Sequence, residues 1–454
     1  MSEDLGPSPL AAGERNLSVQ EARAAITRSL VPLPRRESTP VALHEAVGRV
    51  LAADVVSPID VPAHDNSAMD GYAFAGGALA GGGPVVLRAA GAVYAGRPFA
   101  ARVAGGQCVR IMTGAVMPEG TDTVVPLELA QVQGSPDQGE VRIAAGTIRP
   151  GENRRKRGED LAAGKPALRA GRVLRPADVG LAASLGLTAV PVMRPLKVAI
   201  FSTGDEVVAP GAPLPPGCIY DSNRYALAAA VRRLGMEAID LGLVRDDRAA
   251  LAAVVERALG EADVVITSGG VSAGDADYTR DVLAAHGDVS FWKVAMRPGR
   301  PFAFGPLRRP PGAGAVDAAG KPAQGAAART GDTSWLFALP GNPVAALVTF
   351  YAFVREALLV LAAATPEPLP QLSARSTAAI RKRPGRTEFQ RAIVEPATEA
   401  AGGAPGWQVR LSGSQGAGVL RSMSEANALV VLGHEQGSVA AGEPVTVWLF
   451  EGLV

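Results

Sequence analysis

Short apolar runs alternate with amphipathic stretches in the chain after Pro195. The apolar runs predict β-strands, and the amphipathic stretches of about ten residues predict helices. Strands that alternate with helices are typical of a mostly parallel sheet that is covered on both faces, where ligands bind at the carboxyl ends of the strands. The predicted strands are 198–202, 237–244, 264–267, 291–296, 302–304 and 335–339, and the predicted helices are 224–234, 248–259, 278–286 and 344–363.

The chain before Pro195 has a different pattern. Ser18 and Glu21 have the spacing of a capping box, which predicts a helix from there to Leu30. Apolar residues at 43, 46, 47, 50 and 51 predict a second helix over 41–53. Residues 61–141 contain short apolar runs between turns rich in Gly, Pro and Asp, which predicts a small β-rich unit. A polar bridge over 149–160 and a helix over 176–185 follow.

Three further segments complete the pattern. We expect residues 1–16 to be a disordered tail, and 308–332, which is rich in Ala, Gly and Pro, to be a disordered surface insertion. Residues 369–454 show short β runs between glycine turns, which indicates a small β-barrel or sandwich. The fold class that we predict is therefore α/β and β multidomain.

Composition narrows the choice of function. The 454 residues carry a formal net charge of +1, which argues against a protein that coats nucleic acid. Two cysteines are too few for a disulfide scaffold. Together with only four histidines, they provide few ligands for a zinc site. The first residues lack the pattern of a signal peptide, and the apolar run over 343–354 is shorter than the ~18 residues of a membrane span. We expect a cytoplasmic protein without a membrane or nucleic-acid partner.

Several polar loops follow the predicted strands, so we expect them at one edge of the sheet. The loop over 267–278 contains Gly269 and Gly270 and ends at a helix start, where backbone N–H groups can bind an anion. Four carboxylates near strand ends would repel one another unless a divalent cation joined them, and hard oxygen ligands favour Mg²⁺. These carboxylates are Glu206, Asp246, Asp275 and Asp277.

Three cations are clustered at Lys293, Arg297 and Arg300. Such a cluster can hold an oxyanion, and arginines can do so with two hydrogen bonds each. Anion loops, carboxylates for Mg²⁺ and these cations together indicate a phosphate or phosphoanhydride substrate.

Simpler interpretations exist for each of these residues alone. Asp70 and Thr113 each precede a glycine and are typical turn residues. Asp221 and Asn342 have the position of helix N-caps. Lys293 could be a solvent-facing residue of an edge strand. The occurrence of all these loops in one chain favours the functional interpretation.

The motifs together resemble one family. The chain is similar to the molybdopterin molybdenumtransferase family, which is related to the E domain of gephyrin, from about Leu17 to Val454. The motifs are DNSAMDGYA (65–73), RIMTGA (110–115), RRKRGED (154–160), FSTGDE (201–206), IYDSN (219–223), SGGVSAGDADYT (268–279), PGRPFAFG (298–305) and LPGNPV (339–344).

This resemblance implies an arrangement of four parts and a homodimer. An elongated linker domain would comprise 17–56 and 157–194, with an inserted β-rich domain over 57–156. A molybdopterin-binding-like α/β domain would follow over 195–365, and a C-terminal β domain over 366–454. The active site would lie between the α/β domain of one subunit and the inserted domain of the other.

The resemblance also implies a reaction. Adenylylated molybdopterin and molybdate would be the substrates, the phosphoanhydride would be cleaved with the help of Mg²⁺, and AMP and Mo-molybdopterin would leave. An enzyme that adenylylates molybdopterin would supply the substrate. The implied catalytic residues are Asp70, Thr113, Asp160, Glu206, Asp246, Asp277 and Lys293, with Asp275 beside the metal. The implied binding residues for pterin phosphate or molybdate are Arg155, Ser268, Gly269, Gly270, Ser272, Arg297, Arg300, Pro301 and Arg386.

The chain departs from the family pattern at four positions. Arg297 and Arg300 stand where relatives often have Lys, and Ala345 and Ala417 stand where Ser is common. A guanidinium is planar and larger than an ammonium, so the contact with molybdate would be reshaped. Two other functions stay open: a scaffold without catalysis, as in gephyrin, and an enzyme that adenylylates a pterin or cleaves pyrophosphate.

Overall fold

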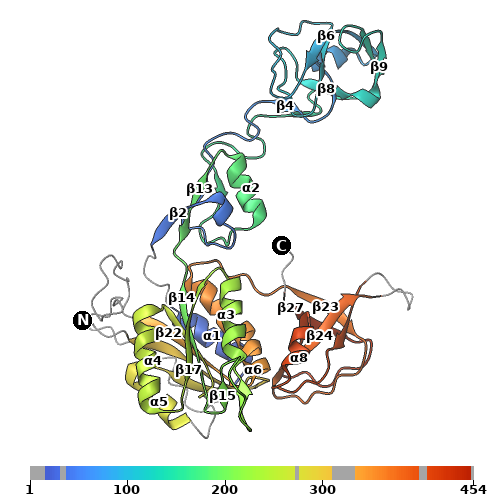
Figure 1. Ribbon diagram of the computed structural model, residues 1–454. Helices are drawn as coiled ribbons and strands as arrows, with labels where there is room; N and C mark the ends of the chain where they lie inside the picture. Colours follow the sequence, from blue (N-terminus) through green and yellow to red (C-terminus); the bar gives the residue numbers. More distant parts are fainter. Residues whose placement is uncertain (1–15, 31–36, 271–275, 309–332, 398–405, 451–454) are drawn as a thin grey trace, which may run out of the picture.

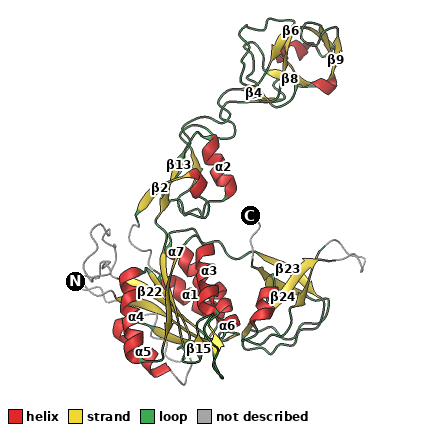
Figure 2. Ribbon diagram, viewed as in Figure 1, coloured by secondary structure: helices red, strands yellow, loops and turns green. Residues whose placement is uncertain are grey.

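The computed structural model describes residues 16–30, 37–270, 276–308, 333–397 and 406–450. Figure 1 shows an elongated molecule in which an α/β domain and a C-terminal β domain lie next to each other at one end. A small linker region connects them to an inserted β-rich domain at the opposite end (Figure 2). The expected tail over 1–15 and the expected insertion over 309–332 lie outside the described residues.

The α/β domain contains a seven-stranded sheet in the order β1-β19-β21-β22-β18-β14-β17. Only β21 runs antiparallel to its neighbours, which confirms the predicted mostly parallel sheet. The central strands are buried along nearly their whole length, as expected for a sheet that is covered on both faces. The strands are β1 (Asn16–Leu17), β14 (Lys197–Thr203), β17 (Glu237–Val244), β18 (Val264–Ser268), β19 (Ser290–Val294), β21 (Pro301–Arg308) and β22 (Thr333–Leu339).

Helices cover both faces of this sheet. Alternate residues of β14 point to opposite faces, so that Ile200 packs with one group of helices and Phe201 with the other. The first group is α1 (Val19–Ser29), α3 (Asn223–Arg233), α6 (Pro343–Thr349) and α7 (Arg355–Leu361), and the second is α4 (Arg248–Glu261) and α5 (Ala276–His286). The predicted helix over 344–363 is interrupted by a π-helical turn, η4 (Phe350–Val354). Pro343–Leu361 is apolar and long enough to cross a membrane, but 72% of its apolar 18-residue stretch is buried within the protein.

Two predictions for the N-terminal part are wrong. The capping box at Ser18 and the helix that follows it are confirmed, but this helix packs in the core of the α/β domain and not in the linker domain. The predicted helix over 41–53 does not form. Its first residues instead belong to β2 (Ser38–Ala42), which pairs with β13 (Ala189–Met193), and a short 3-10 helix η1 (Leu43–Glu45) follows. Gly48 has a φ of +78°, which a helix does not contain.

The rest of the linker region is small. β3 (Val55–Val56) pairs with β12 (Pro166–Leu168), and α2 (Pro176–Ser184) confirms the predicted helix. Leu51, Leu174 and Val192 are among the buried residues of its separate core.

The inserted domain is a six-stranded sheet in the order β8-β5-β7-β6-β10-β9. A narrow neck joins it to the linker region, where β4 (Asn66–Ser67) pairs with β11 (Arg154–Arg155). The sheet strands are β5 (Gly71–Phe74), β6 (Val85–Val93), β7 (Gln107–Ile111), β8 (Thr123–Pro126), β9 (Ala130–Gln133) and β10 (Glu140–Ile143), with 3-10 helices η2 (Gly76–Gly81) and η3 (Leu127–Leu129).

The C-terminal domain is a closed five-stranded barrel, because β24 pairs with both β25 and β26. The barrel is therefore the correct one of the two predicted architectures. A short strand of the α/β domain, β20 (Met296–Arg297), adds to β24 and joins the two domains. The barrel elements are β23 (Gln371–Ser376), β24 (Thr387–Pro396), β25 (Trp407–Leu411), α8 (Leu420–Glu425), β26 (Ala428–Leu432) and β27 (Pro444–Leu449).

Candidate functional site

A cleft of about 600 Å³ opens at the carboxyl edge of the α/β sheet. The loops after β14, β17, β18 and β22 form it, together with the start of α3 and a loop of the C-terminal domain. The C-terminal domain contributes Gly418 and Leu420, which no sequence pattern indicated. The α/β residues that carry polar groups into the cleft include Thr203, Glu206, Asp221, Ser222, Asn223, Asp246, Ser268, Gly269, Gly270 and Asn342.

Asn223 connects three of these loops. Its Nδ2 donates a hydrogen bond of 2.6 Å to Ser268 Oγ and another of 2.7 Å to the carbonyl oxygen of Gly341. Ser268 Oγ in turn donates to the carbonyl oxygen of Pro340 at 3.3 Å. The ends of β18 and β22 and the start of α3 are thus held in one arrangement.

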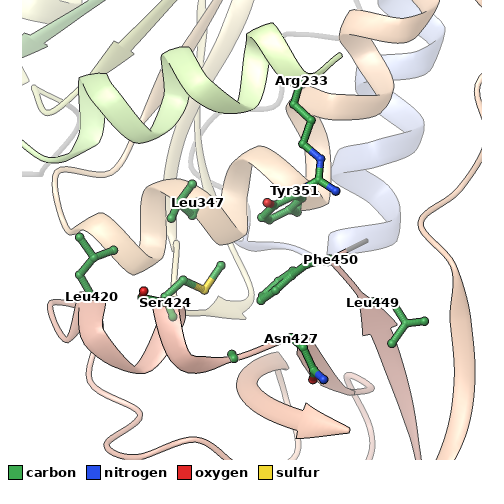
Figure 3. A pocket seen from close by; sticks show the side chains of 10 residues that line it. Arg233, Leu347, Tyr351, Leu420, Ser424, Asn427, Leu449 and Phe450 are labelled. Carbon is green, nitrogen blue, oxygen red and sulfur yellow. The ribbon is translucent and has the colours of Figure 1, made fainter. Parts of the chain in front are cut away.

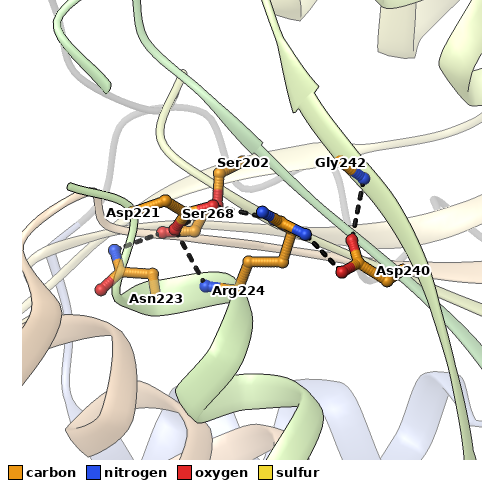
Figure 4. A network of polar contacts seen from close by, with 7 residues as sticks. All are labelled: Ser202, Asp221, Asn223, Arg224, Asp240, Gly242 and Ser268. Carbon is orange, nitrogen blue, oxygen red and sulfur yellow. Dashed lines mark hydrogen bonds and ion pairs between the residues drawn. The ribbon is translucent and has the colours of Figure 1, made fainter. Parts of the chain in front are cut away.

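A buried ion pair lies behind this arrangement (Figure 4). Arg224 Nε donates to Asp221 Oδ2 at 2.8 Å, and the same guanidinium also binds the carboxylate of Asp240 on β17. Ser202 Oγ, at the end of β14, donates to Asp221 Oδ1 at 3.2 Å. Burial would lower the pKa of Arg224, but the hydrogen bonds that its guanidinium donates to Asp240 and Asp221 keep this pKa above its ordinary value. Asp221 is therefore a carboxylate whose charge is matched within the fold.

Two glycines allow the loop after β18 to approach β14 closely. Gly269 has a φ of +98° and Gly270 a φ of +67°. A Cβ atom on Gly269 would lie 2.6 Å from the carbonyl oxygen of Thr203, so a side chain would not fit there. These glycines are part of the predicted anion loop, and the structure places them in the cleft.

Two of the four predicted metal ligands, Glu206 and Asp246, line the cleft. The Glu206 carboxylate folds back over Gly204, since a Cβ on Gly204 would lie 2.7 Å from Glu206 Oε2. Ser272 and Asp275 lie outside the described residues, as does the side chain of Asp277. Within the described part of the chain, no three His, Cys, Asp or Glu side chains gather as a metal site. The two carboxylates that are described supply hard oxygen donors of the kind that Mg²⁺ binds.

The predicted cations lie farther along the same edge of the sheet. The strand register pairs Ser202 with Ser268, and Ser268 with Leu339 at the end of β22. On the far side of β22, Pro301 begins β21 and pairs with Lys293 near the end of β19. Lys293, Arg297 and Arg300 are all exposed.

Arg297 lies against the C-terminal domain, and Arg386 belongs to that domain. Arg297 lines a cavity of about 250 Å³ that also involves Glu388 and the buried Arg391. Arg386 Nε donates to Glu388 Oε1 at 2.9 Å. The buried Glu388 thus offsets the charge of Arg386, and the sequence analysis did not anticipate this pairing. Ala417, one of the departures, lies beside Gly418, and its carbonyl oxygen accepts a hydrogen bond from Val344 N. Ala345 is buried in α6.

Asp70 and Thr113 form a pair in the inserted domain. Thr113 donates to Asp70 Oδ1 from its backbone N at 2.6 Å and from its Oγ1 at 2.7 Å. These two hydrogen bonds, the backbone one first, lower the pKa of Asp70. Arg155 and Asp160 are exposed near the neck of this domain. The inserted domain, which carries Asp70 and Thr113, lies at the other end of the molecule from the α/β domain, so one chain does not bring this pair to the cleft (Figure 1).

Comparison with known proteins gives consistent matches along the chain. Residues 17–186 match the family model "MoeA N-terminal region (domain I and II)", 199–360 match "Probable molybdopterin binding domain", and 373–450 match "MoeA C-terminal region (domain IV)". The "Molybdopterin molybdenumtransferase" of Haemophilus influenzae is 38% identical over 439 residues, which cover 96% of this chain and all of that protein. The "Molybdopterin molybdenumtransferase 2" of Mycobacterium tuberculosis is 38% identical over 90% of this chain and 94% of its own length.

A solved structure has the same architecture. The molybdopterin biosynthesis moeA protein of Pyrococcus horikoshii OT3 matches with a TM-score of 0.74 and 26% identity, over 96% of this chain and all of that one. The resemblance found in the sequence is thus confirmed. The chain belongs to the MoeA family, whose N-terminal, molybdopterin-binding and C-terminal regions it contains in that order.

Proposed function

We propose that the protein is a molybdenumtransferase of molybdenum cofactor biosynthesis. It inserts molybdate into adenylylated molybdopterin, cleaves the phosphoanhydride and releases AMP and Mo-molybdopterin. The observation that carries this proposal is the cleft at the carboxyl edge of the sheet. The cleft combines Glu206 and Asp246 with the Ser268–Gly270 loop. The same edge of the sheet continues beyond the cleft and carries the three predicted cations.

The chemistry of the edge suits this substrate. Mg²⁺ would be held by Glu206 and Asp246 together with Asp275 and Asp277, and when bound it would offset negative charge on the phosphoanhydride. Gly269 N donates to the carbonyl oxygen of Leu339, so within the Ser268–Gly270 loop it is the N–H of Gly270 that suits a phosphate. Lys293, Arg297, Arg300 and Pro301 would bind molybdate. We place this reaction in the cytoplasm, with an enzyme that adenylylates molybdopterin as donor of the substrate.

A direct test is the release of AMP from adenylylated molybdopterin with molybdate and Mg²⁺. We expect Glu206→Ala and Asp277→Ala to reduce this release by about 10²-fold or more, since they remove charge stabilisation at the reacting group. Glu256→Ala is the control, because Glu256 is an exposed carboxylate on α4 away from the cleft. Undiminished activity of the cleft variants would refute their roles. ATP consumption without any need for molybdate would indicate an adenylylating enzyme instead.

We further propose that the active enzyme is a homodimer in which Asp70 and Thr113 of one subunit complete the cleft of the other. The remote position of this pair in one chain supports the proposal. Mixing Asp70→Ala with Glu206→Ala tests it, because a mixed dimer has one site with both residues intact. We expect each variant alone to be inactive and an equal mixture to recover about a quarter of the activity. No recovery, although the subunits exchange, would contradict the shared site, and dimers of wild-type protein without any activity would favour a scaffold.

A further inference from the structure

A second cavity, of about 670 Å³, lies between the α/β domain and the C-terminal barrel. Its volume is within the range of small-molecule sites, ~300–1,000 Å³. The end of α3, the helix α6 with its π-helical turn, α8 and the end of β27 surround it (Figure 3). No residue predicted for the transferase reaction lines it.

One wall of this cavity is aromatic. The rings of Tyr351 and Phe450 are stacked, with centroids 5.4 Å apart and planes at 23°. Met423 and Leu347 add apolar surface, and a thioether packs well against aromatic rings. Tyr351 belongs to the π-helical turn η4, and such turns within α-helices frequently occur at functional sites. The wall suits a planar ring.

A cation lies at the same cavity. Arg233, in the last turn of α3, extends toward Tyr351 in Figure 3. The other large polar group, the amide of Asn427, is used within the barrel, since it exchanges two hydrogen bonds with the backbone of Val394. Arg233 is the lining residue that carries a full positive charge, and a guanidinium favours an anion.

This cavity adjoins the catalytic cleft. Leu420 lines both, as the first residue of α8. α6 begins at Pro343 in the cleft and reaches the cavity at Leu347. A ligand in the cavity would contact a wall that the cleft shares.

We propose that this cavity is a second ligand site, which binds a nucleoside monophosphate with its base against Tyr351 and Phe450 and its phosphate at Arg233. The base is a planar heteroaromatic ring and the phosphate is an anion, so the pair matches the two features of the cavity. The choice of adenosine monophosphate as the probe rests on the proposed function, in which it is the released product. Binding to the cavity, however, needs no molybdopterin chemistry.

The experiment measures AMP binding to the full-length protein by titration calorimetry. We expect Arg233→Gln to weaken this binding by about tenfold or more, because it removes a charge-assisted hydrogen bond. Arg232→Gln is the matched control, since Arg232 and Arg233 are both exposed and adjacent on α3 but only Arg233 lines the cavity. Tyr351→Leu should weaken binding as well, and Glu206→Ala should leave the Arg233-dependent component in place.

Three results would overturn the site: no AMP binding at millimolar concentration, equal binding by wild type and Arg233→Gln, or adenosine binding as tightly as AMP. The outcome is separable from the proposed function. Loss of the transferase reaction in Glu206→Ala with intact Arg233-dependent binding would support both proposals. A protein that binds AMP in this way but never releases it from adenylylated molybdopterin would refute only the function.

Discussion

The two regions that carry candidate site residues each contain an aspartate of interest, Asp221 and Asp70. The two carboxylates differ in burial and in whether a cation is bound to them. Asp221, in the α/β domain, is buried and bound to a guanidinium that is itself held by Asp240. Asp70, in the inserted domain, is exposed, and its described hydrogen-bond donors are the two groups of Thr113. The fold itself thus holds Asp221 in place beside the cleft, whereas Asp70 is an exposed carboxylate, which the proposed dimer would place at the cleft of the other subunit.

The largest expected effect concerns Arg224. Arg224→Met would leave Asp221 buried without its cation, and breaking such a pair costs about 3–5 kcal/mol. All tryptophans (Trp292, Trp335, Trp407 and Trp448) lie outside the inserted domain, so their fluorescence follows unfolding of the α/β domain and the barrel. Arg232 is exposed on the same helix and acts on Asp240 only through a weaker Coulombic attraction, so Arg232→Met should change the unfolding free energy by less than about 0.5 kcal/mol. Equal effects of both variants would show that the buried pair is not what stabilises this region.

A smaller effect is expected at the exposed pair. Thr113→Val removes the hydroxyl donor but keeps the backbone donor, so the pKa of Asp70 should rise toward its ordinary value. Asp70 would then become protonated at a higher pH, and the acidic limb of the pH–rate profile should move up in pH. Thr121→Val, whose hydroxyl binds a backbone carbonyl of the same domain, is the control. An unchanged acidic limb in Thr113→Val would mean that ionisation of Asp70 does not limit the reaction.

The sequence predicted the α/β domain better than the linker region. The strand over 237–244 has the predicted bounds, because it lies between clear turns. The helix predicted over 41–53 failed because β2 takes its partner, β13, from about 150 residues away in the chain. Local periodicity contains no information on such a distant partner.

The candidate site likewise contains residues that a local sequence pattern predicted and residues whose role depends on distant partners. The glycine loop and the carboxylates of the cleft were found because they follow strands, whereas Asp240 was missed because it lies within a strand and meets Arg224 only after β17 and α3 pack together. The pairing of Arg386 with Glu388 had a local signal, since residues two apart in an extended chain share a face. The contribution of Gly418 and Leu420 had none, because it depends on how the barrel meets the α/β domain.

The smallest expected effect uses the two cysteines to compare the regions directly. Burial in the core of the inserted domain raises the pKa of Cys108 to about 12, so its thiol is almost entirely protonated near neutral pH. Cys218 is only half-buried, in the loop before β16 (Ile219–Tyr220) at the mouth of the cleft. A disulfide reagent at pH 8 should therefore label Cys218 rapidly in the native protein, and Cys218→Ser should abolish this rapid phase of labelling.

Slow labelling of Cys108 then reports on opening of the inserted domain. If the two regions unfold independently across the narrow neck, Arg224→Met should leave the Cys108 rate unchanged, whereas a matching acceleration would show that the two regions open together.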